Sequence, residues 1–226
     1  MKQVCFYRET QPFGELCNFF TLSSPIIYKG KSYPTSEHLY QALKYSFPGS
    51  PSINNKYMEL IGKASTPNKS KILANQSINS RYHWQKQLSD TIHEYQKLGI
   101  KTRPDWEKAK VFVMRLVLRL KFQTDKHCKQ VLLSTGDAQL VEDSPHDYYW
   151  GRGSKGNGTN MLGKLLMEIR SEIMEEESSQ ADQQTHFLES QETKKRKTGN
   201  DNIIDYLLNK KKQHLNDDGA KIVSSL

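Results

Sequence analysis

Residues 34–45 read Pro-Thr-Ser-Glu-His-Leu-Tyr-Gln-Ala-Leu-Lys-Tyr, and this segment constrains the fold more than any other part of the chain. Thr35 follows a proline and is suited to cap a helix, with Glu37 near the positive end of the helix dipole. Residues three or four positions apart share a helix face, so Glu37, Gln41 and Lys44 lie on one side. Beside them runs an apolar stripe made of Leu39, Ala42, Leu43 and Phe47. The pattern predicts an amphipathic helix over residues 35–47.

The polar face of this predicted helix has two interpretations. A carboxylate and an amine about 10 Å apart along one helix can bracket a small ligand, with Glu37 as acid or base and Lys44 as nucleophile. Alternatively, both side chains are solvated and have no chemical role. Spacing by itself leaves both interpretations open.

The remainder of residues 1–175 predicts more helices and a few short strands. Extended segments are expected at 4–7, 25–28 and 32–33. Further helices are expected at 54–64, 67–78, in part of 81–98, at 105–122 and at about 160–174. Residues 131–133 and 139–142 flank a turn at 135–137. The sequence therefore predicts an α+β fold, a predominantly α-helical single domain with a small β component.

Residues 176–226 differ from the rest of the chain. They begin with a polar stretch that lacks hydrophobic periodicity, so we expect a mostly disordered tail. It contains a basic cluster at 194–197, of the type that directs nuclear import, and a short apolar motif at 203–208. The segment 200–208 resembles the peptide that docks on the replication sliding clamp, with Asn200 in place of glutamine and Leu207 in place of an aromatic residue. The alternative is a C-terminal helix packed on the domain.

Charge and cysteine content narrow the class of protein. The formal net charge is +8, and Lys and Arg nearly balance Asp and Glu after residue 175, so the basic excess lies in the first 175 residues. The positive electrostatic potential of these residues favours a polyphosphate or nucleic-acid partner. Alternatively, the charge serves solubility alone. The three cysteines have no zinc-site spacing, so we expect reduced thiols and no metal or cofactor. Without a long apolar run, the chain is expected to be intracellular, in the nucleus, the cytoplasm or both.

Four separate blocks together identify a family resemblance. They begin at Phe13 (F-G-x-x-x-N-F), Pro34 (P-T-x-E-H-x-x-Q-A-x-K), Ser144 (S-P-x-D-x-x-W-G-x-G) and Asn160 (N-x-L-G-x-x-L-M). In order and spacing they resemble the YbiA-like NADAR family, whose name refers to NAD and ADP-ribose. The resemblance covers about residues 5–174.

The resemblance implies an N-glycosidase, an enzyme that cleaves the bond between ribosyl C1 and nitrogen. It implies that Lys44 is the covalent nucleophile, which attacks the anomeric carbon and forms a Schiff base with the opened ribose. Such a lysine needs a neutral amine and hence a lowered pKa. Glu37 would move protons as the base leaves and water returns. Asp147 is the third catalytic candidate, which binds ribose hydroxyls or steers a proton.

The same blocks supply the candidate ligand-binding residues. Aromatic side chains suit stacking on a planar base, and a glycine-rich loop before a helix suits a phosphate. Packing and loop-building roles are the alternative for each of them. The candidates are Phe13, Gly14, Asn18, Phe19, Gln41, Tyr149, Trp150, Gly151, Arg152, Gly153 and Asn160.

Three functions are compatible with this pattern. The leading hypothesis is a glycosidase that removes ADP-ribose from ADP-ribosylated guanine in DNA or RNA, reversing nucleic-acid ADP-ribosylation as in DNA repair. The second is a glycosidase acting on riboflavin-pathway ribosylamino intermediates. The third is a non-catalytic module that binds ADP-ribose or NAD, against which Glu37 and Lys44 argue because a binding module needs no nucleophile.

Overall fold

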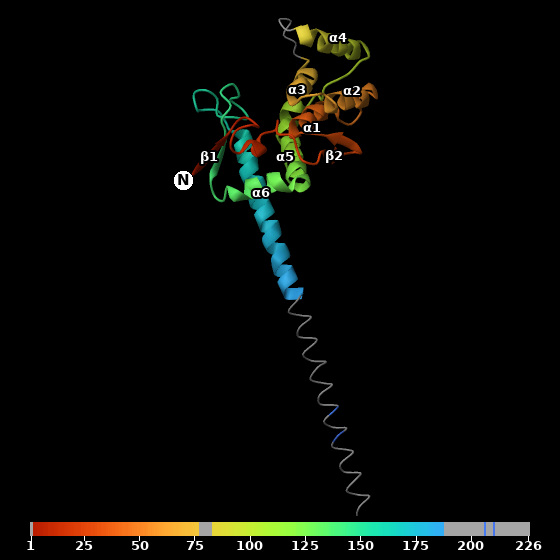
Figure 1. The fold of residues 1–226 in the computed structure, drawn as a ribbon. Helices are drawn as coiled ribbons and strands as arrows, with labels where there is room; N and C mark the ends of the chain where they lie inside the picture. The colour runs from red at the N-terminus through yellow and green to blue at the C-terminus, as the bar shows by residue number, and fades with distance from the viewer. Residues whose placement is uncertain (1, 77–82, 188–205, 207–209, 211–226) are drawn as a thin grey trace, which may run out of the picture. The chain divides into compact units, whose positions relative to one another are not determined.

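Helix α1 (Ser36–Ala42) lies at the centre of the folded part of the chain, where it packs against α2 (Ile53–Gly62), α3 (Pro67–Asn75) and α5 (Trp106–Thr124). Figure 1 shows these helices gathered around it. The structure is a computed structural model that describes residues 2–76, 83–187, 206 and 210. It divides the chain into two units, residues 1–172 and 173–226.

The predicted cap of α1 is confirmed. The Thr35 hydroxyl accepts a hydrogen bond from the His38 backbone amide, and the His38 ring bonds the same hydroxyl and the Ala64 carbonyl. The predicted end of the helix was wrong, because α1 stops at Ala42 and tightens into a 3₁₀ turn, η2 (Leu43–Tyr45). Phe47 therefore lies beyond the helix and is only half-buried.

Four short strands form two separate pairs. Strand β1 (Gln3–Phe6) pairs in parallel with β4 (Gln139–Glu142), with Val4 opposite Leu140. Strands β2 (Ile26–Tyr28) and β3 (Lys31–Tyr33) form an antiparallel hairpin. Its two turn residues, Lys29 and Gly30, both have positive φ, as a tight hairpin turn requires. The β1–β4 pair ties the start of the chain to a segment that precedes the last helix.

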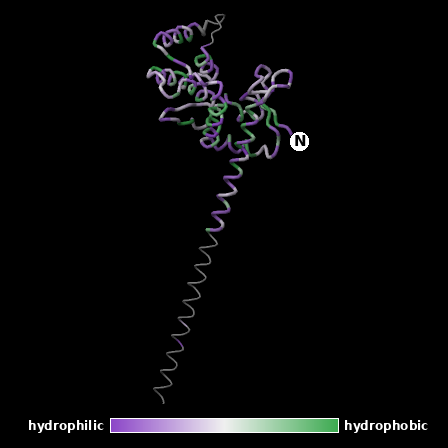
Figure 2. The backbone as a smooth tube through the Cα atoms, turned by 180° about the vertical axis from the view of Figure 1, so that it is seen from behind, coloured by the Kyte–Doolittle hydropathy of each residue, from purple (hydrophilic) through white to green (hydrophobic). Residues whose placement is uncertain are grey.

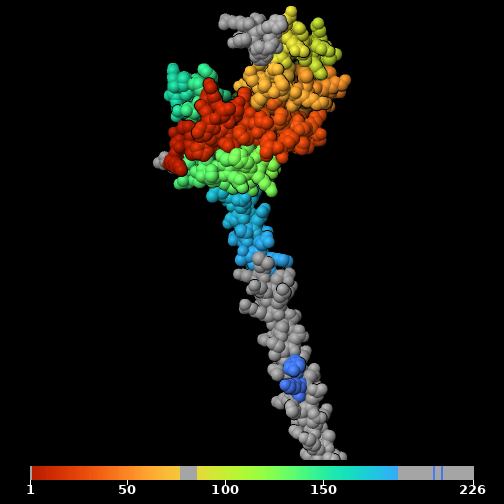
Figure 3. Space-filling view, viewed as in Figure 1, coloured from red at the N-terminus to blue at the C-terminus, as the bar shows by residue number. Residues whose placement is uncertain are grey.

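The other helices complete the first unit. Helix α5 buries the side chains of Val113, Met114, Val117, Leu118 and Phe122, and its ends lie within two residues of the predicted 105–122. Helix α4 (His83–Lys97) lies within the predicted 81–98. Helix α6 (Lys126–Ser134) was not anticipated as a helix; the Asp125 carboxylate caps it by accepting from the Cys128 amide. Figure 2 shows hydrophobic stretches gathered towards the middle of this unit, and Figure 3 shows the N-terminal residues beside the α6 region.

The last helix spans residues 161–187, longer than the expected 160–174. Its residues 176–187 are therefore helical and exposed, where the polar sequence had suggested irregular chain. The second unit is described for residues 173–187, together with residues 206 and 210. The basic cluster at 194–197 lies outside the described residues, as does the apolar motif at 203–208 apart from Tyr206. The predicted α+β, mainly helical domain is confirmed for the first unit. No helix among the described residues is long and apolar enough to cross a membrane.

Candidate active site

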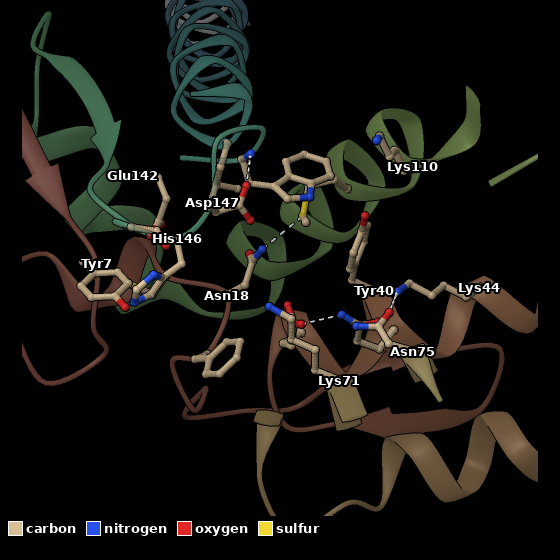
Figure 4. Close-up of a pocket in the computed structure, with 18 of the residues that line it drawn as sticks. Tyr7, Asn18, Tyr40, Lys44, Lys71, Asn75, Lys110, Glu142, His146 and Asp147 are labelled. Carbon is tan, nitrogen blue, oxygen red and sulfur yellow. Dashed lines mark hydrogen bonds between the residues drawn. The ribbon is translucent and has the colours of Figure 1, made fainter. Parts of the chain in front are cut away.

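A cavity of about 690 Å³ opens in the first unit. Its walls come from segments far apart in the sequence, namely the N-terminal loops, α1 with η2, α3, α5 and the loop that follows β4. Figure 4 shows side chains from these segments converging on one space. The lining includes Asn18, Phe19, Glu37, Gln41, Lys44, Asp147 and Trp150, which are seven of the candidates named above. A volume in this range, roughly 300–1,000 Å³, is typical of small-molecule sites.

Helix α1 and η2 carry the central polar groups of the cavity. Glu37, Gln41 and Lys44 all line it, as their shared helix face predicts. The Gln41 amide donates to the Glu37 carboxylate at 2.6 Å. The backbone amide of Glu37 donates to the Asn18 carbonyl at 3.0 Å. This backbone hydrogen bond joins the first sequence block to the second at Glu37.

Lys44 lies in an environment that favours the neutral amine. Burial lowers its pKa from 10.5 to about 8, although the charge of Glu37 acts in the opposite direction. Its Nζ donates to the Asn75 side-chain oxygen and lies 5.4 Å from the centre of the Trp106 ring. About one amine in ten is then neutral at pH 7. This is the property that a nucleophilic lysine requires.

Glu37 is buried, with 5% of its surface exposed. Burial raises the pKa of its carboxyl, while the hydrogen bond from Gln41 and the charges of Lys71 and Lys44 lower it in part. A carboxyl that holds its proton more tightly than usual, in the same cavity as a weakly basic amine, is suited to proton exchange. Glu37 and Lys44 are therefore candidates for acid–base chemistry.

Aromatic rings form a second part of the wall. Tyr40 contacts both Trp106 and Trp150, with ring centroids 5.1 and 5.8 Å apart. Tyr149 packs edge-on against Trp150 at 5.1 Å, and the Lys110 ammonium lies 4.0 Å from the Tyr149 ring centre. Trp106 and Trp150 line the cavity, whereas Tyr149 supports Trp150 from behind. This wall offers apolar faces to a planar ligand.

Asp147 anchors the loop that carries Trp150. Its Oδ1 accepts hydrogen bonds from the backbone amides of Tyr149 and Trp150, at 2.9 and 2.7 Å. Asn18 donates weakly to the Met114 sulfur, and its Oδ1 is buried without a partner among the described residues. Asp147 and Asn18 thus both contribute polar atoms to the lining.

Seven candidates do not line the cavity, and each has a structural explanation. Phe13 adopts a left-handed conformation before the 3₁₀ turn η1 (Gly14–Leu16). A Cβ at Gly14 would lie 2.3 Å from the Glu9 carbonyl oxygen, so close packing requires glycine there. Gly153, at φ +66°, leaves room for the Tyr148 ring. The others are Tyr149, Gly151, Arg152 and Asn160, which support the wall or build the loop behind it.

The cavity also contains residues that the sequence reasoning did not select. Lys71 and Asn75 come from α3, and Trp106 and Lys110 come from α5, two helices whose polar residues had no distinguishing spacing. Glu142 at the end of β4 lies two residues before the third block, and this position was the one available signal. The residue is 8% exposed, and burial raises the pKa of its carboxyl to about 8, with Asp147 and Asp143 acting in the same direction. Among the described residues, no group of three or more His, Cys, Asp or Glu is placed to hold a metal ion.

Comparison with known proteins identifies the class to which this domain belongs. The NADAR domain family matches residues 5–174, which is most of the chain. The chain therefore belongs to the NADAR family, as a YbiA-like member.

Individual relatives agree with this assignment. N-glycosidase YbiA of Escherichia coli strain K12 is 36% identical over 170 residues, covering 75% of this chain and 88% of that protein. An N-glycosidase of Nostoc punctiforme is 37% identical over 172 residues, covering 75% of this chain and 92% of that protein. The chloroplastic riboflavin biosynthesis protein PYRR of Zea mays is 34% identical over 174 residues, which are 76% of this chain but only 25% of that protein.

A solved structure supports the fold. The NMR structure of Escherichia coli YbiA is similar with a TM-score of 0.58 at 33% sequence identity, covering 78% of this chain and 87% of that one. Together the relatives support an N-glycosidase, a hydrolase of N-glycosyl bonds.

Proposed function

We propose that this protein removes ADP-ribose from ADP-ribosylated guanine in DNA or RNA. The observation that carries the proposal is Lys44, an amine with a pKa of about 8 in a cavity that it shares with the buried carboxyl of Glu37. A binding module for ADP-ribose would gain nothing from a dehydrated amine. A covalent glycosidase requires one.

The proposed reaction proceeds through a Schiff base on Lys44. The neutral amine attacks the ribose C1, and the C1–N bond to the base breaks, with its electron pair going to the base nitrogen. The amine passes a proton to Glu37 in its carboxylate form. Glu37 returns this proton to the ring oxygen as the ribose ring opens and the imine forms. Water then adds to the imine, releases the ribose aldehyde and restores Lys44. No oxidant or metal is needed, since every step transfers only protons and electron pairs.

The lining of the cavity supports a nucleotide-like substrate. Lys71, Lys110 and Arg8 add positive charge to the walls, which suits a diphosphate. Trp106 and Trp150 offer faces on which a base can stack, an interaction worth about 1–3 kcal/mol per base. The net charge of +8 also favours a nucleic-acid substrate over a small neutral one.

A second candidate substrate is a ribosylamino intermediate of riboflavin synthesis. The similarity to the maize protein, whose name places it in riboflavin biosynthesis, favours this alternative. It would use the same Lys44 and Glu37, because the bond to be cleaved is again between ribose C1 and nitrogen. It would leave most of the basic lining without a ligand group to bind.

The test is a direct comparison of the two substrates. The protein is incubated with an oligonucleotide carrying ADP-ribosylated guanine and, separately, with a ribosylaminopyrimidine, and released products are measured by mass spectrometry. Release of ADP-ribose at the higher kcat/KM supports the proposal, and turnover of the pyrimidine alone refutes it. Glu37→Gln and Lys44→Ala are expected to abolish turnover while the fold survives. Borohydride added during turnover should attach the ribose product to Lys44, and full activity of Lys44→Ala would end the covalent mechanism.

A further inference from the structure

Glu142 is held at the cavity by a framework built from the third and fourth sequence blocks. Its backbone amide donates to the Asn160 side-chain oxygen at 2.9 Å, and its carbonyl accepts from the Arg152 amide at 2.9 Å. Asn160 also donates to the Leu140 carbonyl at 2.8 Å, although its own φ is +51°. A Cβ at Gly151 would lie 2.9 Å from the Glu142 carbonyl oxygen. These candidate ligand-binding residues are thus arranged around Glu142 rather than around the cavity.

The Glu142 side chain itself reaches the cavity from the wall opposite Lys44. Figure 4 shows Glu142 beside His146 and Tyr7 at one side, with Lys44 and Asn75 at the other. Charged neighbours act on it from several elements: Asp147 and Asp143 repel a negative charge, and Lys121 and Lys71 attract one. With burial, the net result is a pKa of about 8, so the carboxyl holds its proton at neutral pH. A buried acid that remains protonated at pH 7 is the form required of a proton donor.

The proposed reaction needs two proton transfers at separate places. The amine of Lys44 must lose a proton as it bonds to C1, and the departing base must gain one as it leaves. Glu37 lies on the same helix face as Lys44, which suits the first transfer. The carboxyl of Asp147 is less suited to the second, because its Oδ1 is already occupied by two backbone amides.

We propose that Glu142 is the general acid that protonates the departing base, whereas Glu37 serves Lys44. This inference rests on the proposed function and deepens it. As the C1–N bond breaks, its electron pair goes to the base nitrogen and takes the proton of the Glu142 carboxyl. The base leaves neutral, and the Glu142 carboxylate regains a proton from the water that enters to hydrolyse the imine.

The test separates loss of the leaving group from formation of the imine. Glu142→Gln keeps the size of the side chain but cannot donate an acidic proton. Its kcat on ADP-ribosylated guanine is expected to fall by about 10²–10⁴-fold, the usual contribution of a general acid. The reacting ribose of free ADP-ribose carries an aldehyde in its open form and has no base attached to its C1 that would have to leave. Cyanoborohydride trapping of free ADP-ribose on Lys44 should therefore proceed in Glu142→Gln within about threefold of the wild-type rate.

Glu59→Gln is the matched control, because it makes the same change at an exposed glutamate on α2 that pairs with Lys63 and does not line the cavity. It is expected to retain cleavage and trapping. If Glu142→Gln cleaves within about threefold of wild type, or loses trapping as severely as cleavage, the general-acid role is overturned. Cleavage by the wild-type protein tests the proposed function separately. Should the wild type cleave the ribosylaminopyrimidine instead, the same comparison of cleavage and trapping applies to that substrate.

Discussion

The Trp106 ring lies beside Lys44, and replacing it with alanine tests whether burial by this ring lowers the pKa of the amine. Burial lowers the pKa of Lys44 from 10.5 to about 8, which increases the neutral fraction at pH 7 about 300-fold. The ring has two opposing effects, since it excludes water from the amine but also attracts the charged form from 5.4 Å. Such a cation–π attraction is worth about 0.5–1 kcal/mol at partly exposed sites, less than a tenfold effect. Burial as a whole therefore outweighs the cation–π attraction in setting the pKa of Lys44.

Trp106→Ala is expected to raise the pKa of Lys44 from about 8 towards 10.5. Trapping of free ADP-ribose on Lys44 should then fall about 10–100-fold at pH 7 and recover at high pH. The assay measures the trapping rate between pH 5 and 10 and locates the midpoint of its rise. Trp106→Phe keeps an aromatic face and should retain a midpoint near that of the wild type. A midpoint at or below that of the wild type in Trp106→Ala would refute the argument that burial sets this pKa.

Three further predictions concern the framework and the tail. The Asp125 carboxylate accepts hydrogen bonds from the amide and hydroxyl of Ser23 and from the Cys128 amide. Burial raises the pKa of Asp125, but these hydrogen bonds outweigh burial and hold the pKa below its usual value of 3.8. Asp125→Ala should lower the free energy of unfolding, measured in urea, by about 2–4 kcal/mol. In the wild type this stabilisation should be present above the unfolded-state pKa of Asp125 and be lost as the pH falls through its lower folded-state pKa. A variant as stable as the wild type would contradict this prediction. Gly158→Ala places a Cβ 2.4 Å from the Gly151 carbonyl oxygen. The free energy of unfolding should therefore fall by about 1–3 kcal/mol, and kcat should fall as well. An unchanged thermal unfolding midpoint would contradict this prediction. We further propose that the tail docks on the sliding clamp and directs the protein to the nucleus. A peptide of residues 198–215 should bind the clamp and lose binding on Ile203→Ala/Tyr206→Ala. Absence of binding at high micromolar peptide would refute the docking proposal.

Local sequence determined the elements that depend on neighbouring residues. Thr35 caps α1 because its hydroxyl reaches the His38 amide within the same turn. Glu37, Gln41 and Lys44 face one cavity because helical spacing aligns them, even though the last of the three lies in a 3₁₀ turn. The apolar period of α5 likewise predicts its buried side. These features follow from interactions over three or four residues, which a sequence displays directly.

Tertiary structure alone decided the parallel pairing of β1 with β4, which joins segments more than 130 residues apart. It also decided which residues surround Lys44. Asn75 and Trp106 are more than thirty and sixty positions away from it, and no periodic pattern connects them. The pKa values of Lys44 and Glu142 depend on how much water the whole fold excludes, and that quantity has no local signature. The sequence thus determined which residues carry an amine or a carboxyl at these positions, whereas burial by distant segments determined whether those groups are protonated at neutral pH.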